Sequence, residues 1–207
     1  MQRLGGVRTL KWAPLVTPER KFFPPTEARG EARAEVIFRI VCGLMGVESH
    51  RCELVDPALG TPIQTQGQPH AVTYSDVSSP GKLVAEFATQ LAELVLAPIW
   101  GHLPGGDDLF GPACSATVVY KGLGIFGADM ALQTWAEPGR RGSYHADTTG
   151  YLSEQTMAFL LALYLALTDR RKDADAWLDI PVKALVHDAA RYLDGRPDIL
   201  EPLRRID

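Results

Sequence analysis

Cysteine is scarce in this sequence, and the three cysteines show no paired spacing. No CxxC motif is formed by Cys42, Cys52 and Cys114. Because three cysteines cannot all pair with one another, they do not indicate a disulfide framework. We therefore expect a protein of a reducing compartment, the cytoplasm. The first fifteen residues contain no uninterrupted apolar stretch, so the sequence predicts no signal peptide.

Long uncharged apolar runs are also missing. The two most apolar segments are 83–100, which Glu86 and Glu93 interrupt, and 157–167, which is too short to cross a bilayer. An excess of positive charge is absent as well, because the formal net charge is −4. The composition therefore indicates neither a membrane protein nor a nucleic-acid binder.

Charge is distributed unevenly along the chain. Residues 1–30 contain six Lys or Arg against two Glu, whereas the remaining residues contain fifteen against twenty-three Asp or Glu. Four prolines between positions 14 and 25 disfavour helix. We expect residues 1–30 to form an extended basic arm packed on a single domain of residues 31–207. The apolar side chains expected to hold the arm there are Trp12, Leu15, Val16, Phe22 and Phe23.

Hydrophobic periodicity predicts an α+β fold, with about five helices around a buried central helix and a small sheet. The helices are expected at residues 31–45 (ended by Gly46), 83–97 (ended by Pro98), 114–135, 153–169 and 182–193. The strands are expected at 51–55 and 70–75. Loops are expected at 57–69, 101–112 and 137–150, and a hairpin connection is the alternative for the first of them. The helix expected at 153–169 is apolar nearly all round. Small residues in the helix expected at 114–135 favour close packing against another helix. The side chains expected to be inaccessible in the fourth helix are Phe159, Leu160, Leu163, Tyr164 and Leu167.

A polar stripe follows one face of the helix expected at 83–97. Glu86, Thr89, Gln90 and Glu93 recur at spacings of three and four residues. One interpretation is the solvated edge of an amphipathic helix, and the other is a functional face, because buried polar groups need partners. The surrounding segment, ATQLAELVL, resembles the helix that carries the HExxH motif in a bacterial zincin-like family, most of whose members have no known function.

Four further segments resemble the same family in the same order along the chain. They are APLVTPERKFFPP, AEVIFRIVCGLMGVESHRCELV, KGLGIFGADMAL and TTGYLSEQTMAFLLALYLAL. The resemblance covers about residues 14–170, and GLGIF and GYLSEQ are its most specific parts. It implies a zincin-like domain, in which two His four residues apart bind zinc and the intervening Glu acts as a general base.

This sequence departs from the family motif at its functional positions. Thr89 stands at the first His, Gln90 at the Glu and Glu93 at the second His, while Gly111 and Ser115 replace the acidic residues of a downstream ExxTD element. Thr and Gln are poor zinc ligands, and Gln cannot act as a general base. The resemblance therefore implies a non-catalytic pseudo-zincin without a cofactor. We expect the cleft vacated at these five positions to bind a small ligand or an unidentified protein partner.

Two other interpretations stay open. A relocated zinc site, formed by Glu93, His102 and Asp107 or Asp108, would make the protein a metal-dependent hydrolase. Alternatively, the protein is a structural subunit, such as a homodimer in which the basic arm docks onto the acidic body of its partner. These hypotheses are separated by the metal content and by the mass in solution.

Overall fold

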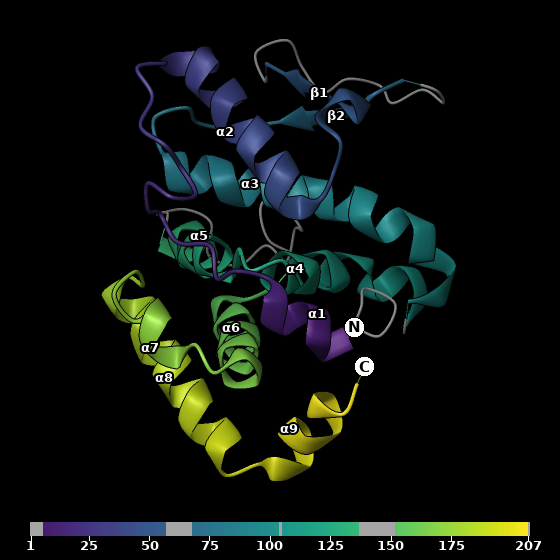
Figure 1. The fold of residues 1–207 in the computed structure, drawn as a ribbon, viewed down its shortest axis with the longest axis vertical. Helices are drawn as coiled ribbons and strands as arrows, with labels where there is room; N and C mark the ends of the chain where they lie inside the picture. Colours follow the sequence, from purple (N-terminus) through teal and green to yellow (C-terminus); the bar gives the residue numbers. More distant parts are fainter. Residues whose placement is uncertain (1–5, 57–67, 104, 137–151, 207) are drawn as a thin grey trace.

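The computed structural model describes residues 6–56, 68–103, 105–136 and 152–206 (Figure 1). This part of the chain is mostly helical, with one small sheet, which agrees with the expected α+β class. It contains nine α-helices, more than the five or so that periodicity predicts. They are α1 (Gly6–Trp12), α2 (Gly30–Met45), α3 (Pro80–Leu96), α4 (Phe110–Tyr120), α5 (Gly124–Ala136), α6 (Glu154–Thr168), α7 (Arg171–Ala174), α8 (Ile180–Asp194) and α9 (Pro197–Arg204). The expected loop over 137–150 and most of the one over 57–69 lie outside the described residues.

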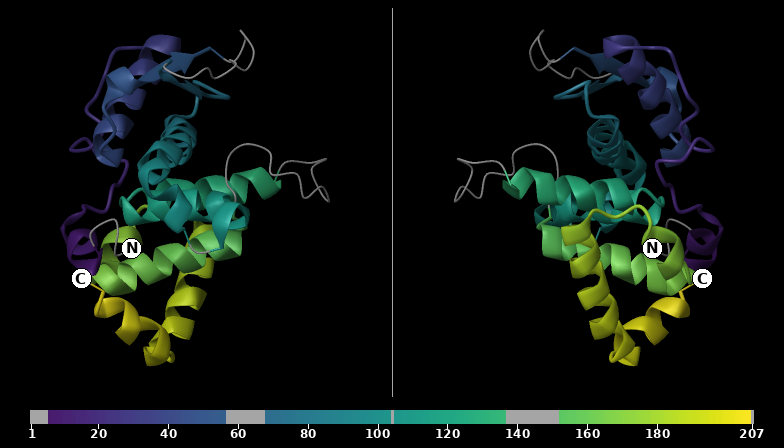
Figure 2. Two further views of the ribbon diagram at one scale, coloured as in Figure 1. Left: turned by 90° about the vertical axis from the view of Figure 1, so that its right-hand side faces the viewer. Right: turned by 90° about the vertical axis from the view of Figure 1, so that its left-hand side faces the viewer.

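The elements are stacked in three layers (Figures 1 and 2). The upper layer holds α2, α3 and the sheet, the middle layer holds α4 and α5, and the lower layer holds α1 and α6 to α9. Two hydrophobic cores lie between the layers. The middle layer supplies Val118 and Phe126 to the upper core, and Val119 and Ile125 to the lower core. Because α4 is covered on two sides, it has no clear polar face.

The sheet consists of β1 (Cys52–Val55) and β2 (His70–Thr73), both close to the expected positions. The two strands are parallel, with Leu54 opposite Val72. Parallel strands cannot be joined by a tight hairpin, so the hairpin alternative for the connecting segment is wrong.

Two predicted helix ends are confirmed. α2 ends at Gly46, which has a φ of 74° and whose N–H bonds the carbonyl groups of Cys42 and Gly43. α6 begins after Ser153, whose hydroxyl oxygen accepts a hydrogen bond from the Thr156 N–H. Local sequence signals are sufficient at both ends, because each cap is formed by neighbouring residues.

The single helix expected over 114–135 is wrong, because the chain breaks between α4 and α5. Gly122 lies at the break with a φ of 86°, a conformation that side chains rarely adopt. Its carbonyl oxygen accepts a hydrogen bond from the Val16 N–H at 2.9 Å, and a methyl group at this position would overlap the Pro14 carbonyl oxygen. The break therefore gives the N-terminal segment room to cross the middle layer.

The expected close helix packing involves two other glycines, both in α5. A Cβ atom at Gly124 would lie 3.1 Å from Leu161, and one at Gly127 would lie 2.7 Å from Met157. Both of these partners belong to α6. The absence of side chains on this face of α5 thus brings α5 and α6 together.

Helical structure extends beyond its expected limits around α3. This helix begins at Pro80, earlier than expected. It ends at Leu96, close to the expected end before Pro98, and the 3₁₀ helix η4 (Ala97–His102) follows directly. The loop expected over 101–112 is also wrong in part, since it holds the 3₁₀ helix η5 (Gly106–Leu109) and the first turn of α4.

The first thirty residues are not extended throughout, because α1 lies within them. Among the side chains expected to pack on the body, Leu15 and Val16 are buried, Phe22 and Phe23 are half-buried, and Trp12 is 83% exposed. Prolines begin only after this helix, so they do not oppose it.

α6 is the central helix of the lower core and contacts α1, α4, α5, α7, α8 and α9. Its expected burial is confirmed for Tyr164 and Leu167, whereas Phe159, Leu160 and Leu163 are only half-buried. The fully enclosed face carries other residues, among them Leu161 and Leu165. A helix that is apolar all round does not reveal which face is the inner one.

One described stretch, Pro80–His102, is long and apolar enough to span a membrane by length and composition alone. Half of its most apolar window is buried inside the molecule, and Leu83, Phe87 and Leu91 are fully enclosed. This burial is that of a core helix, which is consistent with a soluble protein.

Candidate functional site

The amide of Gln90, which the sequence resemblance aligns with a catalytic Glu, lies against the edge of β2. Its Oε1 accepts a hydrogen bond from the Thr73 N–H at 2.9 Å, and its Nε2 donates to the Thr73 carbonyl oxygen at 2.7 Å. The Thr73 hydroxyl donates to the same Oε1 at 3.4 Å, and Nε2 donates again to the Glu86 carbonyl oxygen at 3.2 Å. An amide has two N–H donors and two acceptor lone pairs, so the hydrogen-bonding capacity of Gln90 is filled.

Glu86, one turn before Gln90, binds the next part of the same chain segment. Its side chain is buried, and its carboxylate accepts hydrogen bonds from the Ser75 N–H at 3.0 Å and from the Ser75 hydroxyl. Through Glu86 and Gln90, α3 supplies hydrogen bonds that a further strand would make at Thr73 and Ser75. Half of the polar stripe on α3 therefore fastens β2 to the helix.

The other motif positions lie on α3 and α4, which pack against each other. The Thr89 hydroxyl donates to the Ala85 carbonyl oxygen of its own helix at 2.9 Å. Glu93 is half-buried, Ser115 is buried and Gly111 lies in the first turn of α4. Burial, and next the nearby charge of Glu93, raises the pKa of the Cys114 thiol to about 12. This thiol is therefore protonated at neutral pH and is not an activated nucleophile.

The relocated zinc site is not assembled in this structure. Its candidates are Glu93 on α3, His102 in η4, and Asp107 and Asp108 in η5. Within the described ranges, no group of three or more His, Cys, Asp or Glu side chains is placed to hold a metal ion. The Asp107 carboxylate instead accepts a hydrogen bond from the indole of Trp100 at 2.7 Å.

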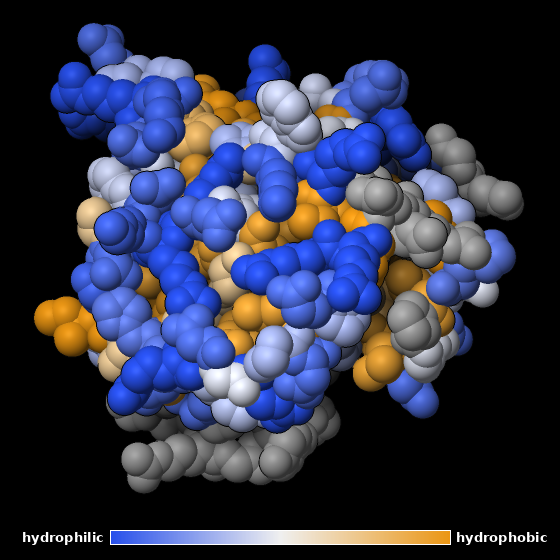
Figure 3. Space-filling view, turned by 60° about the horizontal axis from the view of Figure 1, so that its bottom comes forward, coloured by the Kyte–Doolittle hydropathy of each residue, from blue (hydrophilic) through white to orange (hydrophobic). Residues whose placement is uncertain are grey.

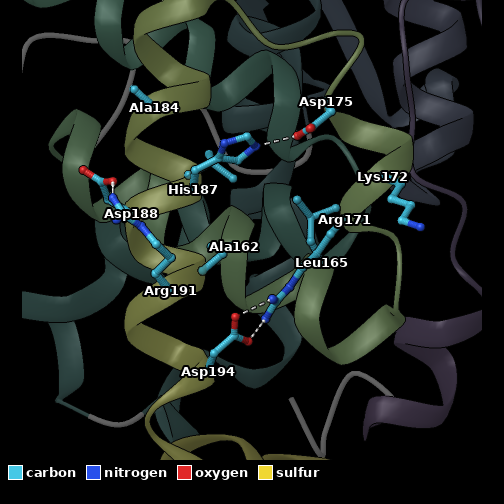
Figure 4. A pocket seen from close by; sticks show the side chains of 12 residues that line it. Ala162, Leu165, Arg171, Lys172, Asp175, Ala184, His187, Asp188, Arg191 and Asp194 are labelled. Atoms are coloured by element: carbon cyan, nitrogen blue, oxygen red, sulfur yellow. Dashed lines mark hydrogen bonds and ion pairs between the residues drawn. The ribbon is translucent and has the colours of Figure 1, made fainter.

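A pocket of about 520 Å³ lies between α6, α7 and α8 (Figure 4). Two cross-links join α7 and its C-cap residue Asp175 to α8 beside the pocket. His187 Nε2 lies 2.8 Å from Asp175 Oδ1, and the Arg171 guanidinium meets the Asp194 carboxylate through two contacts of 2.7 and 3.0 Å. The apolar lining residues are Ala162, Leu165, Ala184, Val186 and Ala190. Seen from below, apolar surface lies between hydrophilic ridges near the middle of the view, and further apolar groups project at its edges (Figure 3).

The charged groups of this pocket largely neutralise one another. The hydrogen bond from His187, followed by the charges of His187 and Lys183, lowers the pKa of Asp175. The hydrogen bond to Arg171 similarly lowers the pKa of Asp194. Neither carboxylate is thus poised as a general base at neutral pH. The pocket suits a small molecule with an apolar body better than it suits acid–base chemistry.

Sequence reasoning did not find this pocket. His187 and Asp194 are seven residues apart on one helix, a spacing that places them on the same face. Their partners Arg171 and Asp175 are four apart, a spacing of about one helical turn, whereas seven residues span about two turns. The pattern is visible in the sequence, but charged residues at such spacings are most often solvated, so it carries little signal.

No family model, curated protein or solved structure matches this chain significantly. The zincin-like interpretation therefore continues to depend on the residue patterns alone.

Proposed function

We propose that this chain is a cytoplasmic, non-catalytic pseudo-zincin that acts by binding. The observation that supports this proposal is the environment of Gln90. A general base at this position would need a free lone pair directed at a water molecule. Gln90 has no ionisable group, and its amide is already engaged by Thr73 and Glu86.

Because these hydrogen bonds already engage the motif side chains, we propose a ligand site elsewhere, in the pocket between α6, α7 and α8. Gln90 and Thr89 are uncharged and their side chains have internal partners, so these two positions offer a ligand little to bind. The α6–α7–α8 pocket has both volume and apolar lining. We place a small ligand there, and a protein partner on the surface of the molecule.

Metal content separates this proposal from the hydrolase alternative. Protein purified without chelator or metal-affinity tag is analysed for zinc by mass spectrometry. We expect no stoichiometric zinc and no peptide hydrolysis. One zinc per chain, lost in the Glu93→Gln variant, would instead support the relocated site and overturn the proposal.

A second experiment tests the structural role of the motif position itself. Gln90→Glu replaces the amide Nε2 with an oxygen facing the Thr73 carbonyl oxygen, and two acceptors without a hydrogen repel each other. We expect a loss of about 1–3 kcal/mol in the free energy of unfolding at pH 8, measured by urea titration. The matched control is Thr89→Val, which removes a hydrogen bond inside α3 only and should cost less than about 1 kcal/mol. Equal stability of wild type and Gln90→Glu would show that the hydrogen bonds between Gln90 and Thr73 do not stabilise the fold.

Rebuilding the whole motif tests whether the backbone retains zincin geometry. The variant combines Thr89→His, Gln90→Glu, Glu93→His and Gly111→Glu. We expect a less stable protein whose melting temperature rises when zinc is added, because a ligand bound only to the native state stabilises it. Ser115→Asp is added to orient a ligand through a hydrogen bond. A melting temperature that zinc leaves unchanged in both variants would count against a zincin-like arrangement of α3 and α4.

A further inference from the structure

Trp12, at the end of α1, is a large apolar side chain that is exposed to solvent. It is 83% exposed, and its neighbours Arg8, Thr9 and Lys11 are exposed as well. These four residues are called the α1 surface. On the other face of α1, Val7 and Leu10 are buried, and Leu10 belongs to the lower core. An exposed indole beside basic residues is unusual on a free surface and typical of protein interfaces.

The α1 helix is held in place at both ends. The Tyr120 hydroxyl donates to the Gly6 carbonyl oxygen at 3.0 Å. At the other end, the Arg170 guanidinium donates to the carbonyl oxygens of Lys11 at 3.1 Å and Ala13 at 2.6 Å. Trp12 is therefore presented by a fixed backbone, which reduces the entropy lost when it is covered.

A surface of complementary character lies in η4 and η5. Residues 83–120 contain no Lys or Arg but four acidic residues. Four exposed residues in η4 and η5 define what we call the η4–η5 surface. They are Trp100 (43% exposed), Leu109 (47% exposed), Asp107 and Asp108. Here apolar side chains lie among carboxylates, and the basic side chain nearest in the sequence is that of His102, since residues 83–120 contain no Lys or Arg.

The η4–η5 surface is also rigid. The Trp100 ring stacks on Phe110 with 3.8 Å between ring centroids, and its indole N–H binds Asp107. This leaves Asp108 as the carboxylate of the surface whose replacement would not disturb Trp100. A preorganised apolar and acidic surface fits a partner segment that combines an aromatic side chain with a cation.

We propose that the α1 surface of one copy docks onto the η4–η5 surface of a second copy of this chain. Trp12 would cover Leu109 and Trp100, and Lys11 would approach Asp108. A second copy is the favoured occupant because this chain carries both halves of the contact, with opposite charge. The proposal goes beyond the proposed function, because neither surface includes a motif position or a residue that lines the α6–α7–α8 pocket. Since the two surfaces differ, the contact closes only when both are used, in a two-fold pair or a ring.

The mass in solution tests the contact. Light scattering of the full chain at increasing concentration should show a rise above the 22.6 kDa of one copy. Trp12→Ala should weaken the association by about tenfold or more, as for a buried interface tryptophan. Ile180→Ala is the matched control, because Ile180 is 86% exposed but lies elsewhere, on α8, and its loss should leave the mass unchanged. A wild-type chain that stays at the mass of one copy throughout would overturn the proposal.

Charge reversal tests which surfaces meet. Lys11→Glu alone and Asp108→Lys alone should each weaken the association, whereas the chain carrying both changes should recover it, because the two charges are exchanged across the contact. Circular dichroism and the melting temperature should remain those of wild type, since both side chains are exposed. Failure of the double variant to recover association would show that these surfaces do not meet. None of these variants alters Gln90, so the outcome is independent of the stability experiment above. Trp12→Ala and Lys11→Glu also leave every candidate zinc ligand unchanged, so they are independent of the metal experiment as well.

Discussion

α3 and α6 occupy comparable places in the two cores, yet they are stabilised in different ways. α3 carries polar groups into the upper core, where Glu86 and Gln90 hydrogen-bond the main chain beside β2. The buried face of α6 is formed by apolar side chains together with Tyr164. Hydrogen bonds are directional, so α3 fixes the position of one strand, whereas packing on α6 depends on volume. Substitutions should therefore act differently in the two cores.

The largest effect is expected where the two cores meet, at Gly122. Its φ of 86° disfavours any side chain, and a methyl group would overlap the Pro14 carbonyl oxygen. Gly122→Ala should therefore displace the N-terminal segment and lower the free energy of unfolding by about 4 kcal/mol or more. Urea titration followed by tryptophan fluorescence measures this.

Gly46→Ala provides the matched control for Gly122. Gly46 has a similar φ of 74°, but a Cβ atom there would meet only the flexible end of Lys121, at 3.5 Å. Only the cost of the left-handed conformation should remain, about 1 kcal/mol. Similar losses in the two variants would mean that the crossing of the N-terminal segment does not constrain the middle layer.

The next largest effect tests the packing of α6. Leu161 is fully buried, whereas Leu163, two residues away on the same helix, is only half-buried. Leu161→Ala should lower the free energy of unfolding by about 2–5 kcal/mol, and Leu163→Ala by roughly half of that or less. The reverse order would show that the inner face of α6 is the one expected from the sequence.

The ends of the helices show how far the sequence can predict this fold. The end of α2 at Gly46 and the start of α6 at Ser153 depend on residues within one helical turn, and they are predicted correctly. The break at Gly122 depends on Pro14, which lies more than a hundred positions away. Periodicity contains no information about such a contact, so the sequence predicts one continuous helix there.

The candidate site also has one part that the sequence predicts and another that only the structure shows. The sequence correctly places the polar stripe on one helix, but it does not reveal that Gln90 binds Thr73, seventeen residues earlier. A buried polar side chain indicates that a partner exists without identifying it. The choice between a ligand and the main chain therefore becomes visible only in the structure.

Two acidic side chains extend the comparison between the cores. Glu86, in the upper core, has hydrogen bonds from the Ser75 N–H and hydroxyl. Asp129, on α5, has a buried Oδ1 without a hydrogen-bond partner among the described residues. Burial, and next the charge of Asp179, raises the pKa of Asp129 from its ordinary value to about 7. A hydrogen bond from the Asp179 main-chain N–H lowers this pKa in part. Deprotonated Asp129 therefore destabilises the native state, whereas Glu86 contributes hydrogen bonds to it.

The smallest predicted effect follows from the raised pKa of Asp129. Between about pH 4 and pH 7 the native state holds a proton that the unfolded chain has lost, so the contribution of this group to stability falls as the pH rises through that window. Asp129→Asn removes the charge, and above pH 7 it should raise the free energy of unfolding by on the order of 1–2 kcal/mol, allowing for partial solvent screening. Near pH 4 the variant and wild type should be equally stable.

Glu86→Gln should instead be destabilising at pH 8, because its amide loses an acceptor that Ser75 uses. Urea titrations of the three proteins at pH 4 and pH 8 measure both effects, and an Asp129→Asn variant no more stable than wild type at pH 8 would show that this carboxylate is adequately solvated.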